Sequence, residues 1–215
     1  MYRTSFYDTK RKEHNMIKNT IRFIKTAALM AGFGFITTNA FCNGTITGTI
    51  DTNMPKYKGN AVVYLVGVKG PAVCEHKTIE QQSLTFMPKV TTVPAGCTVE
   101  FKNNDKINAS VTSFSPAKKF NVDKLETGKS RALTFDKSGV VQLLSKPHQE
   151  MTGWVIVTKN QYAAVTEHDG KFTIPNVPAG TYEISAWSEK LKPQGKTTVT
   201  VAEGKTAPVV LKMAI

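Results

Sequence analysis

The chain reads Leu143-Leu144-Ser145-Lys146-Pro147-His148-Gln149-Glu150-Met151 where the apolar run of residues 140–144 gives way to a polar loop. A short apolar run bounded by Gly and Pro is typical of a buried β-strand. His148 and Met151 follow at the spacing of an imidazole and a weak axial thioether in a mononuclear copper site. Such a site also needs a thiolate just upstream, where this chain has Ser145, whose hydroxyl stays protonated at neutral pH.

The rest of the chain from residue 44 onward continues the same pattern. Short runs of Val, Ile, Thr and aromatic residues alternate with Gly, Pro, Asn and Asp, which predicts an all-β sandwich or barrel. The polar residues 115–128 form the longest interruption and have room for one helical turn. We predict strands over residues 45–50, 61–68, 84–93, 98–103, 110–114, 130–135, 140–144, 154–158, 171–174, 182–187, 197–201 and 208–212.

Residues 1–40 have the features of a secretory signal peptide. Basic residues, among them Lys18 and Lys25, precede the apolar run of residues 27–36, and small residues up to Ala40 suit the cleavage site. The run is shorter than the roughly 20 residues that a membrane-spanning helix needs. We therefore predict a periplasmic or secreted protein with no membrane span after signal removal.

Two alternatives remain at this end of the chain. Met16 stands just before the basic segment and is an alternative start. A lipoprotein anchored through Cys42 would need a small residue before the cysteine, and the bulky Phe41 disfavours it.

The formal net charge of the whole chain is +12, but much of it lies in the predicted signal peptide. Removal of residues 1–40 takes away seven of the 28 basic and two of the 16 acidic residues, which leaves +7. The remaining lysines are scattered among Asp and Glu without a basic run. This pattern predicts a solvated surface and excludes nucleic acid as a partner.

Three cysteines in an exported chain allow one disulfide and one further cysteine. Cys74 and Cys97 both lie in turn-like contexts within one strand-rich region, whereas Cys42 is next to the predicted cleavage point. We predict a disulfide between Cys74 and Cys97. Three unpaired thiols are the alternative, which a cytosolic location would favour.

Several short motifs between residues 77 and 158 occur in a consistent order. In that order they resemble the cupredoxins, specifically the bacterial plastocyanin-like group sometimes labelled methylamine utilisation proteins. The resemblance implies a Greek-key β-sandwich with a copper site. The matching motifs are Thr85-Phe86-Met87-Pro88, Val93-Pro94-Ala95-Gly96, Val99-Glu100-Phe101-Lys102-Asn103, Ser113-Phe114-Ser115-Pro116-Ala117-Lys118-Lys119-Phe120, Phe135-Asp136-Lys137-Ser138-Gly139-Val140-Val141 and His148-Gln149-Glu150-Met151.

The resemblance also assigns the four ligand positions of a type 1 copper site to this sequence. The first imidazole position, after Asn103-Asn104-Asp105, holds Ala109, and the thiolate position holds Ser145. His148 and Met151 match the remaining imidazole and the axial sulfur. Two of the four expected ligands are therefore substituted, which predicts a degenerate site.

Two further stretches lie on either side of the cupredoxin-like region. They are Gly44-Thr45-Ile46-Thr47-Gly48-Thr49-Ile50 with Asn60-Ala61-Val62-Val63-Tyr64-Leu65, and the stretch from Asp169-Gly170 to Thr181-Tyr182. Asp-Gly and Ala-Gly pairs supply the turns of a hairpin, and the apolar residues alternate around them. Together they resemble a carboxypeptidase regulatory-like, or transthyretin-like, β-sandwich, a non-catalytic module. Relatives often carry a His after the Trp of the next strand, where this chain has Ser188.

The two resemblances define the fold class and the domains. We expect an all-β protein in which a cupredoxin-like Greek-key β-sandwich packs with a smaller carboxypeptidase regulatory-like β-sandwich. The predicted parts are residues 1–40 as signal peptide, 41–70 as the N-terminal strands of the regulatory-like module, 71–159 as the cupredoxin-like domain and 160–215 as the remainder of the regulatory-like module.

No arrangement of residues predicts an enzyme. Ser145 with His148 lacks a third orienting group and an oxyanion site. His76 and His168 are expected to be solvated, and Trp154 and Trp187 to lie in the core or between sheets, with a carbohydrate-binding platform as the alternative.

The expected function is therefore a non-catalytic binding or structural role in the periplasm, with no cofactor. Its partner would be a periplasmic protein or a polysaccharide. The alternative is a copper-binding or electron-transfer protein that uses His148 and Met151.

Overall fold

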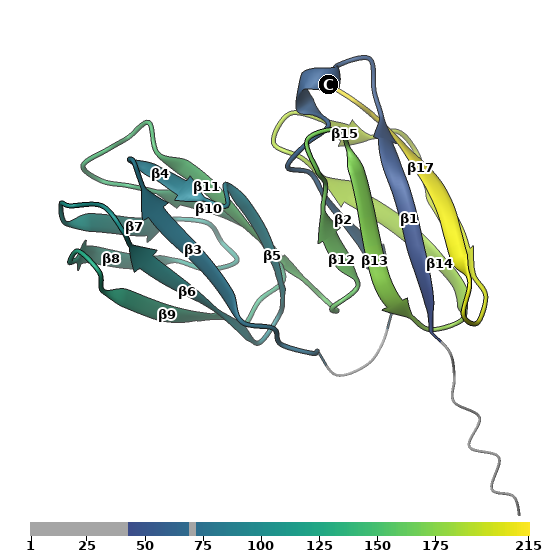
Figure 1. Ribbon diagram of the computed structural model, residues 1–215, viewed down its shortest axis with the longest axis horizontal. Coiled ribbons are helices and arrows are strands. Elements are labelled where there is room, and N and C mark those ends of the chain that lie inside the picture. The colour runs from purple at the N-terminus through teal and green to yellow at the C-terminus, as the bar shows by residue number, and fades with distance from the viewer. Residues whose placement is uncertain (1–42, 69–71) are drawn as a thin grey trace, which may run out of the picture. The chain divides into compact units, whose positions relative to one another are not determined.

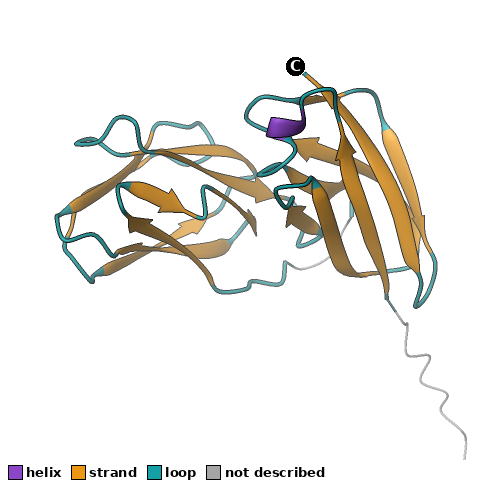
Figure 2. Ribbon diagram, turned by 45° about the horizontal axis from the view of Figure 1, so that its top comes forward, coloured by secondary structure: helices purple, strands orange, loops and turns teal. Residues whose placement is uncertain are grey.

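The computed structural model describes residues 43–68 and 72–215, and in these the backbone is almost entirely β-strand (Figure 2). The short 3-10 helix η1 (Pro55–Tyr57) is the one helical element of these described residues. The predicted signal peptide, the alternative start at Met16, and Cys42 lie outside the described residues. No helix in the described part of the chain is long and apolar enough to cross a membrane.

Strands from both ends of the chain form one β-sandwich, which we call the split sandwich (Figure 1). One sheet has the order β13-β1-β17-β15 and the other the order β12-β2-β14-β16. The strands are β1 (Gly44–Asp51), β2 (Val62–Val66), β12 (Ala163–Val165), β13 (Lys171–Val177), β14 (Gly180–Trp187), β15 (Lys192–Pro193), β16 (Thr197–Val201) and β17 (Thr206–Ala214).

The strands between β2 and β12 form a second sandwich, the inserted sandwich. Its sheets have the orders β5-β11-β10-β7-β8 and β4-β3-β6-β9. The strands are β3 (Lys77–Gln82), β4 (Thr85–Met87), β5 (Val90–Pro94), β6 (Cys97–Asn103), β7 (Ala109–Ser113), β8 (Phe120–Leu125), β9 (Ser130–Phe135), β10 (Gly139–Leu144) and β11 (Thr152–Thr158).

Each sandwich has its own hydrophobic core, because apolar side chains alternate inward along its strands. The core of the split sandwich includes Ile46, Leu65 and Ile174. In the inserted sandwich Phe101 and Phe135 are fully buried and pack with tilted rings, with centroids 6.4 Å apart. Because each sandwich buries its own apolar side chains, the alternating apolar pattern of strands occurs both in the inserted sandwich and in the segments on either side of it.

A third, smaller cluster takes residues from both sandwiches. Val62 of the split sandwich and Val90 and Ile156 of the inserted sandwich are its buried members. Trp154 and Trp187 pack beside them, with ring centroids 5.2 Å apart. The two tryptophans therefore lie between a sheet of one sandwich and a sheet of the other, outside both sandwich cores. All described residues belong to one compact unit.

The hairpin of β10 and β11 positions the loop of residues 145–151. The two strands pair antiparallel from Gly139↔Val157 to Leu144↔Thr152, so the loop closes the hairpin directly after its last pair. β10 also pairs with β7 through Leu144↔Thr112. The loop therefore starts beside β7, the strand that begins with Ala109.

The structure corrects the predicted strands in two regions. The single strand expected over residues 84–93 is divided into β4 and β5, with a cis peptide bond between Met87 and Pro88 at the break. Residues 115–128 contain strand β8 where a helical turn was expected. Because β8 is an edge strand in which only Leu125 is buried, its sequence shows little apolar alternation.

Strands β3, β12 and β15 were not predicted. β3 reads Lys-Thr-Ile-Glu-Gln-Gln and points Ile79 and Gln81 inward, so one of its two buried side chains is polar. β12 and β15 are short strands that form through pairing with β2 and β17. Their pairing is a tertiary property, which local sequence does not reveal.

Candidate metal centre

The loop of residues 145–151 is held at both ends by backbone donors. At its start the Lys146 N–H donates to Ser110 Oγ of β7 (2.9 Å). At its end the Met151 N–H donates to the carbonyl of His148 (2.9 Å), which closes a turn over His148 to Met151. These bonds give the loop a defined path between β10 and β11.

Ser145 continues the inward-facing side of β10. Val141 and Leu143 are fully buried and Ser145 is 3% exposed, at the two-residue spacing of one strand face. Its Oγ is one of three buried side-chain atoms in the described chain without a hydrogen-bond partner; the others are Gln81 Nε2 and Trp154 Nε1. A buried hydroxyl without a hydrogen-bond partner costs free energy. The described chain gives Ser145 Oγ no hydrogen bond that would offset this cost.

Ala109 and Met151 belong to the hydrophobic core of the inserted sandwich. Ala109 is 8% and Met151 3% exposed, and both are members of the cluster that contains Phe101 and Leu143. The structure thus brings two of the four predicted ligand positions into one core, with Ser145 on the inward face beside it. The thioether of Met151 is packed among apolar side chains.

His148 is the fourth position, and its environment differs. Its side chain is 26% exposed, and its Nδ1 lies 3.5 Å from Oε1 of the exposed Glu150. The imidazole is therefore at the rim of the loop and has a carboxylate neighbour from the same loop.

The residues at these four positions do not fit a type 1 copper ion. Copper of this kind is held mainly by one thiolate and two imidazoles, and here Ser145 offers a neutral hydroxyl and Ala109 no donor. One imidazole and one thioether remain. In the described part of the chain, no three His, Cys, Asp or Glu side chains come together in a group that could hold a metal ion.

Cys97 does not supply the missing thiolate in this structure. It forms a disulfide with Cys74, with 5.3 Å between the two Cα atoms, and it is 1% exposed. The third cysteine, Cys42, lies outside the described residues.

The other candidate donors have different surroundings. His76 is exposed, with Nε2 3.2 Å from Glu100 Oε2, and His168 is exposed in a turn. Ser188 Oγ accepts weak hydrogen bonds from the N–H groups of Lys190 and Leu191 (3.4 and 3.3 Å). None of these three residues lies in the loop with His148.

The surface beside the loop is polar. Lys146 Nζ donates a hydrogen bond to Asp123 of β8, and this bond holds the pKa of the Asp123 carboxyl below its ordinary value of 3.8. Asp123 in turn accepts from Asn121, which accepts from the hydroxyl of Thr112 (2.7 Å). Sequence reasoning missed this chain of contacts, because it joins the loop to two strands, β7 and β8.

Comparison with known families gives two matches. Residues 73–158 match the model of copper binding proteins of the plastocyanin/azurin family, which covers strands β3 to β11. Residues 136–209 match the model of polysaccharide lyase family 4, domain II, a fibronectin type III-like domain, which starts within the inserted sandwich and extends to β17. The resemblance to carboxypeptidase regulatory-like sandwiches therefore stays a prediction. No curated protein matches the chain.

Solved structures with similarity to the chain include copper proteins. A copper-containing nitrite reductase from Thermus scotoductus is 27% identical over 43% of this chain and 24% of its own, with a TM-score of 0.37. A purple cupredoxin from Nitrosopumilus maritimus is 23% identical over 38% of this chain and 99% of its own (TM-score 0.35). An oxidized amicyanin variant is 18% identical over 38% of this chain and 81% of its own (TM-score 0.36). The chain thus spans about a quarter of the reductase.

Residues 73–158 thus form a cupredoxin-like domain, a two-sheet sandwich of β3 to β11 that matches the plastocyanin/azurin family model.

Proposed function

We propose that the protein is exported to the periplasm and acts there as a non-catalytic binding or structural module whose cupredoxin domain has a degenerate type 1 copper site. The observation that carries the proposal is Ser145. It stands at the thiolate position on the inward face of β10, buried and with no partner for its Oγ. Export includes removal of residues 1–40 as a signal peptide.

The chemistry of the ligands supports the absence of type 1 redox function. The intense visible band and the strongest bond of such a site come from the copper–thiolate interaction, which a neutral serine hydroxyl does not replace. Ala109 removes a second donor. Two remaining ligands, of which Met151 is packed in the core and His148 is at the rim, are too few for a tight copper site.

The partner in this proposal is a periplasmic protein or a polysaccharide. The second family match supports the polysaccharide, since that model describes a domain of polysaccharide lyases. No catalytic residue is part of the proposal.

A copper titration tests the proposal. Purified protein is titrated with Cu(I) and with Cu(II) by calorimetry, beside the variants His148→Ala and Met151→Ala. A variant of the exposed His168, His168→Ala, is the matched control for loss of a surface imidazole. We expect no tight one-to-one binding and no intense visible band.

The opposite result would support the alternative function. Tight one-to-one copper binding that is lost in both His148→Ala and Met151→Ala, but kept in His168→Ala, would overturn the proposal. It would favour copper handling or electron transfer by the residual pair, for which the preserved turn between His148 and Met151 is the structural argument.

A further inference from the structure

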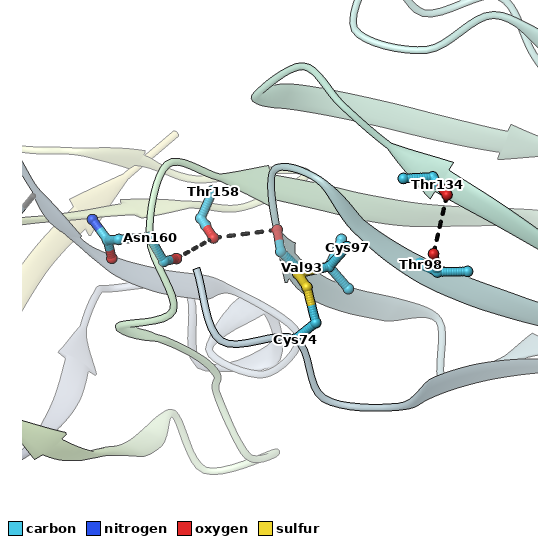
Figure 3. The surroundings of a disulfide bond; sticks show 7 residues. All are labelled: Cys74, Val93, Cys97, Thr98, Thr134, Thr158 and Asn160. Carbon is cyan, nitrogen blue, oxygen red and sulfur yellow. Dashed lines mark hydrogen bonds between the residues drawn. A yellow bond between two sulfur atoms is a disulfide. The ribbon is translucent and has the colours of Figure 1, made fainter. Parts of the chain in front are cut away.

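The chain passes between the two sandwiches twice. The first crossing, residues 67–76, leads from β2 to β3, and the structure describes residues 67–68 and 72–76 of it. The second crossing, residues 159–162, leads from β11 back to β12. Both crossings are attached to the same corner of the inserted sandwich, the turn from Val93 to Cys97 between β5 and β6 (Figure 3).

The second crossing is fastened by hydrogen bonds. The Thr158 hydroxyl lies between two carbonyls, at 2.7 Å from Asn160 O and 3.3 Å from Val93 O, as Figure 3 shows. Asn160 Nδ2 donates to the carbonyl of Leu65 in β2 (3.0 Å), and its Oδ1 accepts from the Tyr162 N–H (3.0 Å). Asn160 is 2% exposed, so these bonds are protected from water.

The first crossing is fastened differently. Residues 72–75 lie outside every strand. Within the described chain their backbone groups form no hydrogen bond with the backbone of any turn or loop. What attaches this stretch to the corner is the covalent bond from Cys74 to Cys97, the first residue of β6. One crossing is therefore held by buried hydrogen bonds and the other by a disulfide.

The two cysteines differ in access. Cys97 is 1% exposed, whereas Cys74 is exposed. A hollow of about 450 Å³ lies beside the disulfide and is lined by both cysteines, with His76 and Glu100 at its side. A thiol can therefore approach the Cys74 sulfur while the sandwich stays folded.

We propose that the Cys74–Cys97 disulfide is a redox-operated latch on the first crossing. A dithiol reductant of the same compartment opens it, and the second crossing keeps the two sandwiches connected in the folded state. Opening frees residues 72–75 from the corner and leaves Lys77, whose pairing with Val99 begins the contact of β3 with β6, at a free end. The latch rests on the proposed export, because a disulfide persists in an oxidising compartment.

The reaction is a two-step thiol–disulfide exchange. A thiolate of the reductant attacks Cys74 Sγ, the Sγ–Sγ bond breaks, and its electron pair leaves with Cys97 Sγ, which takes up a proton. The second thiol of the reductant, as its thiolate, then attacks the reductant sulfur of the mixed disulfide and releases Cys74 as a thiol. Two electrons and two protons pass from the dithiol, which becomes a disulfide, to the two cysteines.

Limited proteolysis after reduction tests the latch. Protein carrying Cys42→Ser, so that a single cysteine pair is present, is treated with dithiothreitol under native conditions and digested briefly with trypsin. Mass spectrometry measures cleavage after Lys77, at the start of β3, and after Lys159, in the second crossing. We expect cleavage after Lys77 to rise about tenfold and cleavage after Lys159 to change by less than about twofold, as for local opening.

A second variant keeps the test decisive. Cys74→Ser with Cys97→Ser, in the same background, is expected to be cleaved after Lys77 at the reduced rate with or without dithiothreitol. Resistance of the folded protein to reduction, an unchanged rate at Lys77, or an equal rise at both lysines would each overturn the latch. Copper is not measured, so a failure here is distinguishable from a failure of the proposed function.

Discussion

Ser145 lies in the loop before β11 and Asn160 in the crossing after it. Both are buried polar residues, but they differ in whether their side chains are hydrogen-bonded. Ser145 is 3% and Asn160 2% exposed. Both polar atoms of the Asn160 side chain, Nδ2 and Oδ1, have a hydrogen-bond partner, whereas Ser145 Oγ has none in the described chain. Burial of a polar group is costly unless it is hydrogen-bonded. Asn160 is therefore expected to stabilise the fold, whereas Ser145, at the predicted thiolate position, is expected to cost stability.

The largest expected effect comes from placing copper ligands at the two substituted positions, Ala109 and Ser145. In the double variant Ala109→His with Ser145→Cys, we expect Cu(II) to produce an intense visible band that the wild-type protein lacks, because the loop of residues 145–151 keeps its path. Absorption spectroscopy after copper addition measures it, with each single variant as a control. A colourless double variant would show that the core has closed around Ala109 and Met151, since a histidine must fit where a methyl group is buried.

Removal of the satisfied residue comes next in size. Asn160→Ala leaves the Leu65 carbonyl and the Tyr162 N–H without their partner, so we expect a loss of about 3 kcal/mol in the free energy of unfolding. Chemical denaturation at neutral pH measures it. The exposed Asn108 provides the control, as Asn108→Ala should be nearly neutral. Similar effects of the two variants would mean that the second crossing is held by packing and not by its hydrogen bonds.

Removal of the orphaned hydroxyl should have the opposite sign. Ser145→Ala takes away a buried donor without a partner and is expected to stabilise the fold by about 1 kcal/mol. The neighbouring Ser110 is equally buried, but its Oγ accepts from the Lys146 N–H, so Ser110→Ala is expected to cost about 1 kcal/mol.

Denaturation curves of these two serine variants provide a matched pair. Opposite shifts of the midpoint are the expected result. A destabilised Ser145→Ala protein would indicate that the hydroxyl has a partner, such as a buried water, and that the position is maintained for structure.

The sequence predicted the strands more readily than the contacts between them. The bounds of β9 and β16 agree with the predicted ones, since these strands alternate or carry β-branched residues. β3 was missed because the buried Gln81 interrupts its apolar pattern. The substituted ligand positions, Ala109 and Ser145, come from comparing motifs, depend only on residue identity and stay a prediction.

The hydrogen bonds that distinguish Asn160 from Ser145 could not be found in that way. Asn160 reaches Leu65, which is 95 positions away in the sequence. The contact exists because β2 and β12 pair across the whole inserted domain. Neither the partner of Asn160 nor the lack of one for Ser145 has a local signal in the sequence.

The smallest expected effect concerns Lys146, which follows Ser145 and faces the solvent. Its hydrogen bond to Asp123 lowers the pKa of that carboxyl below 3.8, so the carboxylate form is favoured in the folded state. The contact therefore contributes stability above pH 3.8, and this contribution is lost as the pH falls through the lowered pKa. Asp123→Asn should therefore lower the unfolding midpoint slightly at neutral pH, and the difference from the wild-type protein should disappear below the lowered pKa. The difference at neutral pH is small because exposed ion pairs are screened. Thermal unfolding from pH 2 to 7 at low and at high salt measures it. An effect of Asp123→Asn at neutral pH as large as that of Asn160→Ala would break the comparison, because stability would then depend on a solvated contact as much as on a buried one.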